Sequence, residues 1–158
     1  MLNKLIWWSP EYIGGKENPY LIRWFMIPRN RLFNIYFHKF CRSDDDRALH
    51  DHPWASCSII LKGAYIEVTK SKSPLKHYDY ARKKSGAISF RRASKAHCIK
   101  LFNRQLSNCG ELEIPIPVWT LFLTGPKVRE WGFHCPKGWR HWRVFTDETG
   151  NSIGRGCE

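Results

Sequence analysis

Two histidines separated by a single residue, His50 and His52, are the first residues in the chain whose spacing suggests chemistry. On an extended strand, residues two apart point to the same face, so both imidazoles could bind one metal ion. A His-x-His pair also arises by chance, as two histidines of a surface or of a core. A metal site therefore needs support from a third ligand elsewhere in the chain.

Two glycines provide that support through their spacing. Gly63 follows His52 by eleven residues, and Gly86 precedes a third histidine, His97, by eleven residues. This layout resembles the two motifs of the cupin superfamily: His-x-His, three or four residues, Glu, six residues, Gly; then Gly, five residues, Pro-x-Gly, two residues, His. The resemblance covers only these two segments. It implies an all-β fold, a single-domain cupin-type double-stranded β-helix (an RmlC-like jelly-roll barrel), with His50, His52 and His97 as metal ligands.

The chain departs from both motifs in ways that change the ligand set that the resemblance implies. The glutamate of the first motif falls on Ser56 or Cys57, and residues 92–94 replace the Pro-x-Gly turn of the second. The expected site therefore has three neutral imidazoles and no carboxylate ligand. Such a site suits one divalent ion of Fe, Zn, Ni, Cu or Mn, and it leaves coordination positions open for water, oxygen or an anionic substrate.

The segment from His50 to Cys57 is also similar to that of the thiol dioxygenases, the cupins typified by cysteine dioxygenase, which use three histidines. Some members carry a cysteine at the place of Cys57 that cross-links to a tyrosine. Residues 119–126, where the tyrosine and a further histidine would be expected, contain neither. The resemblance thus implies the metal triad, with Fe(II) favoured, but not the cross-link or the substrate. Residues 42–47 and 129–134 are similar to segments of phage and bacterial cupin-like proteins of unassigned function, which implies no activity.

Several other side chains are candidates for the chemistry of such a site. Cys57 could be a thiolate beside a cation, or a small buried side chain on a core strand. An arginine that faces a cavity would hold a substrate carboxylate or phosphate by a two-point contact. The catalytic candidates are Arg91, Arg140 and Cys57, and Arg23 and Arg47 are further candidates for the anion contact.

Two polar clusters have more ordinary alternatives. The acidic run at residues 44–46 could supply a carboxylate to the metal or to its ligands, or it could form a polar loop. His134, Cys135 and His141 have spacings that would allow zinc binding. Because no second close pair of ligands accompanies them, we favour a turn at residues 136–138 at the barrel mouth followed by a strand at residues 139–142.

Short runs of aromatic and β-branched residues between turn signals indicate an all-β sandwich or barrel. We predict strands at residues 21–27, 33–40, 56–61, 64–69, 87–90, 97–102, 119–124, 128–134 and 141–145. The two runs on either side of Lys62 and Gly63 are interpreted as a hairpin. Residues 1–146 are expected to form one cupin β-barrel domain, and residues 147–158 a flexible C-terminal tail.

The chain of 158 residues carries a formal net charge of +12. This charge attracts anions, but no run of about five or six like charges forms a basic arm, so a solvated basic surface is the alternative to a nucleic-acid footprint. Its six cysteines permit disulfides. However, the apolar run at residues 5–8 is shorter than that of a signal peptide, and no run approaches the length of a membrane span. We expect a cytoplasmic protein with mostly reduced thiols and no membrane contact.

Three functions are compatible with these features. The first is a metal-dependent oxidoreductase, similar to the non-haem dioxygenases, that acts on a small anionic molecule. The second is a cupin module that binds a metal or a ligand without catalysis, for example in a virion. The third is a nucleic-acid-binding accessory protein, because aromatic and basic residues alternate at residues 23–25, 90–92 and 139–142. Exposed strand edges would also allow a homodimer.

Overall fold

The computed structural model describes residues 9–44, 48–105, 113–147 and 154–158. Two large antiparallel sheets dominate this part of the chain, which confirms the all-β prediction. The first sheet has the strand order β1-β2-β3-β12-β5-β8. Its strands are β1 (Glu11–Ile13), β2 (Leu21–Phe25), β3 (Asn34–Phe40), β12 (Val118–Thr124), β5 (Ser56–Lys62) and β8 (Ile88–Arg91).

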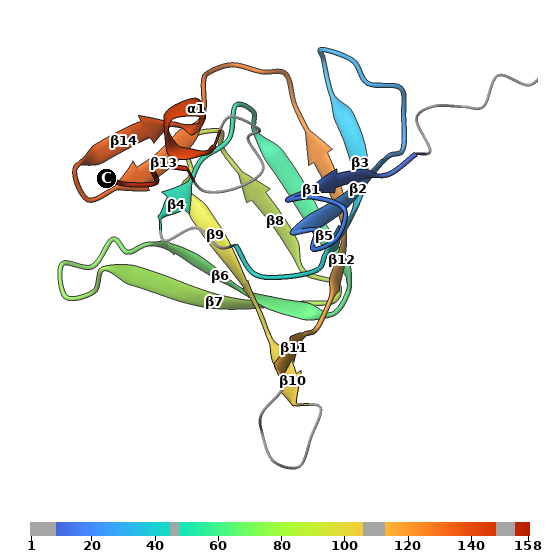
Figure 1. Ribbon diagram of the computed structural model, residues 1–158, viewed down its shortest axis with the longest axis horizontal. Helices are drawn as coiled ribbons and strands as arrows, with labels where there is room; N and C mark the ends of the chain where they lie inside the picture. The colour runs from blue at the N-terminus through green and yellow to red at the C-terminus, as the bar shows by residue number, and fades with distance from the viewer. Residues whose placement is uncertain (1–8, 45–47, 106–112, 148–153) are drawn as a thin grey trace, which may run out of the picture.

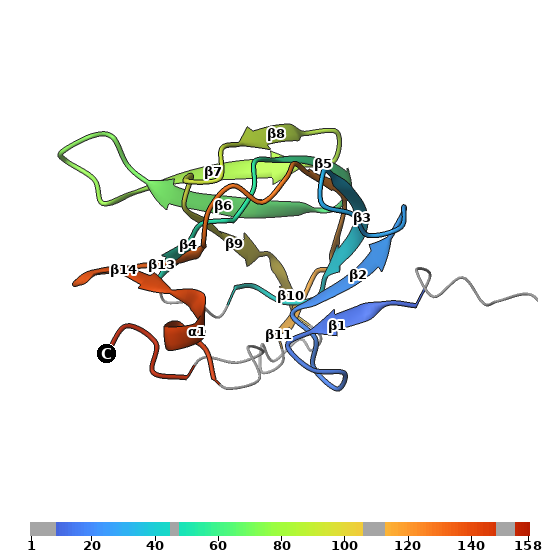
Figure 2. The same ribbon diagram turned by 90° about the horizontal axis from the view of Figure 1, so that it is seen from above.

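The second sheet has the strand order β14-β13-β4-β9-β6-β7. Its strands are β14 (Gly138–His141), β13 (Gly132–Cys135), β4 (Leu49–His50), β9 (His97–Leu101), β6 (Ala64–Lys70) and β7 (Tyr78–Lys84). The two sheets face each other and enclose the interior of a barrel (Figures 1 and 2). A separate pair, β10 (Asn103–Gln105) and β11 (Glu113–Pro115), projects away from the barrel, and a single helical turn, α1 (Trp142–Phe145), follows β14.

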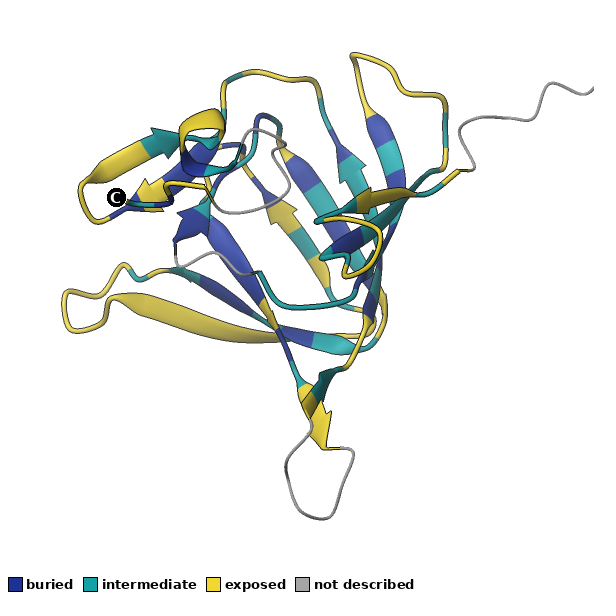
Figure 3. Ribbon diagram, in the orientation of Figure 1, coloured by how far each residue is buried: buried dark blue, intermediate teal, exposed yellow. Residues whose placement is uncertain are grey.

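Strand β3 shows how the sequence alternation builds the barrel wall. Its burial alternates along all seven residues, and Tyr36, His38 and Phe40 are buried while their neighbours are partly exposed. Successive side chains on a strand point to opposite faces, so this alternation turns one face of β3 to the interior. Figure 3 shows a similar alternation of buried and intermediate residues on β5 of the same sheet. One end of the interior is filled by an apolar cluster: Leu21, Phe40, Ile60, Tyr65, Ile99, Leu101 and Val118.

The predicted hairpin around Gly63 is wrong. Strands β5 and β6 are consecutive in the sequence, but β5 pairs with β12 and β8 in one sheet, and β6 pairs with β9 and β7 in the other. Gly63 is therefore the corner where the chain passes from one sheet to the other. It has a φ of +92°, which favours glycine, and a Cβ at this position would lie 3.0 Å from the carbonyl oxygen of Pro117.

Other differences between prediction and structure concern which strands form and where they end. Strands β1, β4, β7, β10 and β11 were not among the predicted strands. Of the strand predicted at residues 128–134, only residues 132–134 are extended, in β13, and residues 142–145 are helical rather than extended. Within the described residues, no helix is long and apolar enough to cross a membrane.

The C-terminal residues 154–158 lie against α1. The backbone N–H groups of Gly154 and Gly156 both donate to the carbonyl oxygen of Phe145, and Cys157 forms a disulfide with Cys135. This disulfide departs from the expectation of reduced thiols for these two cysteines, whereas Cys41, Cys57 and Cys98 are free. Residues 148–153 and Cys109 lie outside the described residues, and the division into a barrel and a flexible tail stays a prediction.

Candidate metal centre

The three histidines predicted as metal ligands meet at the inner face of the second sheet. His50 ends β4 and stands directly opposite His97, the first residue of β9, in the antiparallel register. Residues opposite each other in such a pair project from the same face. His52 lies two residues further on, where its backbone N–H donates to the carbonyl oxygen of Ala93. Register and loop geometry thus bring together side chains that are 45 residues apart in the sequence.

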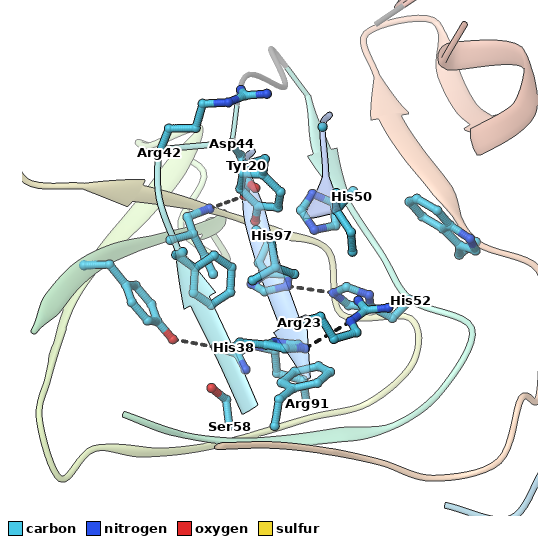
Figure 4. A pocket seen from close by; sticks show the side chains of 18 of the residues that line it. Tyr20, Arg23, His38, Arg42, Asp44, His50, His52, Ser58, Arg91 and His97 are labelled. Atoms are coloured by element: carbon cyan, nitrogen blue, oxygen red, sulfur yellow. Dashed lines mark hydrogen bonds between the residues drawn. The ribbon is translucent and has the colours of Figure 1, made fainter. Parts of the chain in front are cut away.

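The three imidazoles converge closely enough to share one ion. One ligand atom from each histidine lies within 4.8 Å of the others, and the Nε2 atoms of His52 and His97 are 3.0 Å apart. Figure 4 shows the rings of His50, His52 and His97 turned towards one another. Within the described residues, no carboxylate joins this group. The arrangement could therefore hold a metal ion on three nitrogen ligands.

Burial keeps His52 and His97 neutral. It is the main reason why the pKa of His97 falls to about 4, although the nearby carboxylate of Glu67 acts in the opposite direction. The pKa of His52 is also well below its ordinary value, first because of burial and then because His50 and His97 lie beside it. A neutral imidazole offers a lone pair to a metal, so the ligands are ready without losing protons.

Glu67 of β6 is a site residue that the sequence analysis missed. Its Oε1 atom lies 2.6 Å from Nε of Arg91 and 3.2 Å from Nδ1 of His97, which forms no hydrogen bond of regular geometry. Burial alone would raise the pKa of Glu67, but the contact with His97 and the Arg91 guanidinium lower it to about 2. An ionised carboxylate beside the outer nitrogen of a histidine fixes which nitrogen faces the metal.

Arg91 was predicted as a catalytic candidate. The structure places its side chain in the barrel interior, where its guanidinium already contacts other side chains. Its side chain is only 5% exposed. Besides the ion pair with Glu67, its Nη2 donates to the hydroxyl of Tyr65 at 3.3 Å. A buried guanidinium that is already paired with a carboxylate is poorly placed to take up a second anion. Arg91 therefore stabilises Glu67 behind the histidines.

A second arginine, Arg23 of β2, reaches the interior from the opposite sheet. Its Nε donates to Nε2 of His38 at 3.2 Å, and its Nη1 lies 3.7 Å from the carboxylate of Glu11. Figure 4 shows Arg23 and His38 beside His52. Burial, followed by the charge of Arg23, lowers the pKa of His38 well below its ordinary value. Arg23 thus lies in the cavity next to His38, whose pKa is lowered, and beside His52.

The histidines line a cavity of about 570 Å³ between the two sheets. Arg23, His38, Ser58, Tyr65 and Arg91 contribute its polar wall, and its apolar wall includes Leu21, Phe40, Trp54, Ile99, Phe122, Trp131 and Phe133. A cavity of this size accommodates a small molecule. The three metal-ligand candidates therefore face a space that a substrate could enter.

Comparisons with known proteins bear on the fold. No protein-family model matches the chain, and no curated protein sequence matches it. Among solved structures, the chain is similar to a protein with a double-stranded β-helix domain from Klebsiella pneumoniae, with 13% identity over 77% of this chain and 90% of the other and a TM-score of 0.50. An RmlC-like cupin from Shewanella frigidimarina has 14% identity over 75% of this chain and 83% of the other, also with a TM-score of 0.50. The chain has the cupin fold. A third similar structure, an RmlC-like cupin from Ralstonia eutropha, has 12% identity over 87% of this chain and 78% of the other and a TM-score of 0.50.

The motif glutamate that is missing from this chain was expected at Ser56 or Cys57, and these two positions differ in burial. Ser56 is buried, and its Oγ has no hydrogen-bond partner within the described residues. Across the sheet, Ser56 pairs with Arg91. The carboxylate nearest to the histidines is instead Glu67, which approaches His97 through its outer nitrogen rather than joining the ligand set.

The other candidates from the sequence lie away from the histidines or have other partners. Cys57 and Phe90 face each other across β5 and β8 and border a groove on the outer surface, not the cavity. Arg140 donates to the carbonyl oxygen of Gly156 and does not line the cavity. Asp44 lines the cavity and accepts from the backbone N–H of Ile99. Arg47, Asp45 and Asp46 lie outside the described residues.

The zinc site that the sequence analysis considered but did not favour, at His134, Cys135 and His141, does not form. His134 contacts Asp51, Cys135 is in the disulfide, and His141 contacts Glu130.

Asp51 lies between the two ligand histidines in the sequence and has no exposed surface. Burial alone would raise the pKa of Asp51, but its hydrogen bonds outweigh burial and lower the pKa. Its donors are the backbone N–H of Gly132 and the side chains of Arg129, His134 and Trp139. These contacts attach the segment that carries His50 and His52 to β13 and β14.

Proposed function

We propose that this cupin binds one divalent metal ion on His50, His52 and His97 and acts on a small anionic molecule as a metal-dependent oxidoreductase. The observation that carries the proposal is the convergence of three imidazoles on one wall of the cavity between the two sheets, where burial lowers the pKa of His52 and His97. A bound divalent ion would supply Lewis acidity and open coordination positions there. Fe(II) is the metal we favour, because three neutral nitrogen ligands leave room for both oxygen and a substrate.

The charges around the cavity support an anionic substrate. Arg91 is neutralised by Glu67, and the pKa values of His52 and His97 are lowered. Arg23 beside His52 is therefore a cationic side chain of the cavity wall, and Arg42 lines the same cavity. The guanidinium of Arg23 uses Nε for His38, lies over the ring of Tyr36 with its Cζ 4.8 Å from the centroid, and has a long contact of 3.7 Å to Glu11. A guanidinium with free N–H donors binds a carboxylate or phosphate at two points.

Metal analysis tests the ligand assignment. Protein purified without added metal should contain about one equivalent of a first-row ion. The double substitution His50→Ala/His97→Ala should abolish this content, while His77→Ala, an exposed histidine of the loop after β6, should retain it. Full metal content in the double variant with an unchanged circular dichroism spectrum would exclude the triad as the site.

Oxygen consumption separates an enzyme from a binding module. Protein loaded anaerobically with Fe(II) is mixed with thiols, small carboxylates and diketones, and the uptake of oxygen is followed. We expect uptake with at least one anionic compound and none in the His50→Ala/His97→Ala variant. Metal binding without uptake for any compound would favour a cupin that binds a ligand without catalysis.

A further inference from the structure

The outer face of the hairpin formed by β6 and β7 gathers aromatic and basic side chains. The register of the two strands places Tyr78 opposite Lys70, Tyr80 opposite Val68 and Arg82 opposite Ile66. On the other side of β6, Ile66 stands opposite Lys100 of β9. Directly opposite residues share a face, so the exposed side chains of this face form one surface. We call it the hairpin surface; its members are Lys70, Tyr78, Tyr80, Arg82, Lys84 and Lys100, with Lys72 and Lys76 in the connecting loop.

The hairpin surface is positive without local compensation. The acidic residues of β6, β7 and β9 are Glu67 and Asp79, which stand opposite Ile99 and Thr69 on the other face. Glu67 is bound by Arg91 inside the barrel, and Asp79 accepts from the hydroxyl of Ser71. The loop at residues 71–77 contains no acidic residue. Within the described residues, none of the cations of this surface has a carboxylate partner. A patch of one sign attracts a polyanion.

Two tyrosines on this surface are exposed. Tyr78 is 44% and Tyr80 is 63% accessible, and Figure 3 shows β7 exposed along its length. Residues two apart on a strand are separated by ~6.8 Å, so successive rings along β7 are spaced widely enough for separate bases to stack on them. Arg82 is held over the ring of Phe102 at 5.3 Å, which keeps a guanidinium beside the tyrosines.

In the three segments where the sequence analysis found alternating aromatic and basic residues, several of the side chains already have partners within the protein. Trp24 is stacked on Trp119, with ring centroids 5.9 Å apart. Arg91 is buried in its ion pair, and Trp139 uses its indole N–H to bind Asp51. Phe90 is 82% exposed and borders a groove together with Arg92. The hairpin surface differs in that it brings two exposed tyrosines together with several cations that have no carboxylate partner among the described residues.

We propose that the hairpin surface binds single-stranded nucleic acid, with the tyrosines of β7 stacking on bases and the surrounding lysines and arginine contacting phosphates. Exposed aromatic rings flanked by cations are the combination that binds unpaired bases, whereas a duplex keeps its bases stacked inside. The surface lies on the opposite face of β6 and β9 from Glu67 and His97. Binding there is thus independent of the metal site and of the reaction proposed for it.

The test is a titration of fluorescently labelled single-stranded oligonucleotides, oligo(dT) and oligo(U), followed by anisotropy at several salt concentrations. Wild-type protein should bind with an affinity that falls as salt rises. Tyr80→Ala should weaken binding by about 5- to 100-fold, the effect of losing one stacked base. Tyr80→Phe should restore it, because the ring and not the hydroxyl stacks. Lys72→Gln/Lys76→Gln should reduce the slope of log affinity against log salt by about 0.7 per lost phosphate contact.

Matched controls lie on the other sheet and its connections. Tyr12→Ala removes a tyrosine that is 38% exposed on β1, and Lys16→Gln removes an exposed lysine; neither should change the affinity. Equal affinity of Tyr80→Ala and wild type would overturn the proposal, as would binding that does not depend on salt. Tighter binding to duplex DNA of the same length, or binding only to vesicles with anionic lipids, would also overturn it.

Discussion

At the scale of single residues, Glu67 should determine how well the histidines hold a metal. Its carboxylate lies 3.2 Å from Nδ1 of His97, and removing such a partner typically weakens metal binding by about 10- to 100-fold. We therefore expect Glu67→Gln to raise the dissociation constant for Zn²⁺ or Fe(II) by this factor, measured by competition with a chromogenic chelator. Glu130→Gln, which removes an exposed carboxylate outside the cavity, should leave the constant unchanged.

Glu67→Gln also leaves the buried guanidinium of Arg91 without its counter-ion, which destabilises a protein by several kcal/mol. Thermal unfolding of the variant must therefore accompany the metal titration. If Glu67→Gln fails to fold, Glu67→Asp keeps the charge but draws it away from His97, and it should weaken metal binding while it folds. Wild-type affinity in a folded variant would show that Glu67 does not orient His97.

The sequence predicted the three histidines but not Glu67, and the reason lies in how each is encoded. The histidines lie at fixed distances from Gly63 and Gly86, and these distances are visible in the linear chain. Glu67 of β6 contacts Arg91 of β8, which is 24 residues away in the chain and belongs to the other sheet, and no local sequence pattern records a contact across the barrel interior. One signal was present: Glu67 is an acidic residue in the middle of an otherwise largely apolar strand, where a charge on the inner face requires a partner.

At the scale of elements, the corner at Gly63 should be less tolerant of substitution than the turn at Gly86. Both glycines have a positive φ, +92° and +86°, but a Cβ at Gly63 would lie 3.0 Å from Pro117 and 3.1 Å from Val118, and one at Gly86 would contact nothing within 4 Å. Gly86→Ala should lower the free energy of unfolding by about 1–2 kcal/mol from backbone strain alone. Gly63→Ala should lower it by a further ~1–3 kcal/mol from overpacking.

Urea unfolding of the two alanine variants and the wild type measures this difference, because Gly86→Ala controls for the strain that both positions share. Equal losses of stability in the two variants would contradict the role of Gly63 as a packed corner between the sheets.

The same corner explains which elements the sequence could predict. Strands with an inward apolar alternation, such as β3 and β12, were found close to their observed bounds. The strands that pair with β5 and with β6 were not predicted. Lys62-Gly63 has the same local signature in a hairpin as in a corner between two sheets, and the choice depends on the contacts of β5 with β12 and of β6 with β9. Strand β7 was missed because an exposed edge strand needs no apolar face.

At the scale of the whole molecule, the sequence determined the amount of charge but not its location. The net charge of +12 is spread along the chain without a basic run. The fold separates acidic from basic side chains. Glu67 and Asp51 are buried against cations, while the cations of the hairpin surface are exposed next to one another. Strand register produces this separation, since alternate residues of β6 and β7 go to opposite faces.

The buried ionisable groups predict how the stability of the metal-free protein depends on pH. The pKa of His97 is about 4 in the folded chain and has an ordinary value of 6.5, so between these values the unfolded chain binds a proton that the folded chain does not. Stability contributed by neutral His97 is therefore lost as the pH falls from 6.5 to about 4, by up to ~3 kcal/mol. Glu67, with a pKa of about 2 against 4.5, extends the loss as the pH falls from 4.5 to about 2. Urea midpoints of chelator-treated protein should thus decrease steadily below pH 6.5. His97→Gln removes one of these titrating groups and should flatten the upper part of this decrease, whereas wild-type midpoints that stay constant from pH 7 to 4.5 would contradict the burial of neutral histidines.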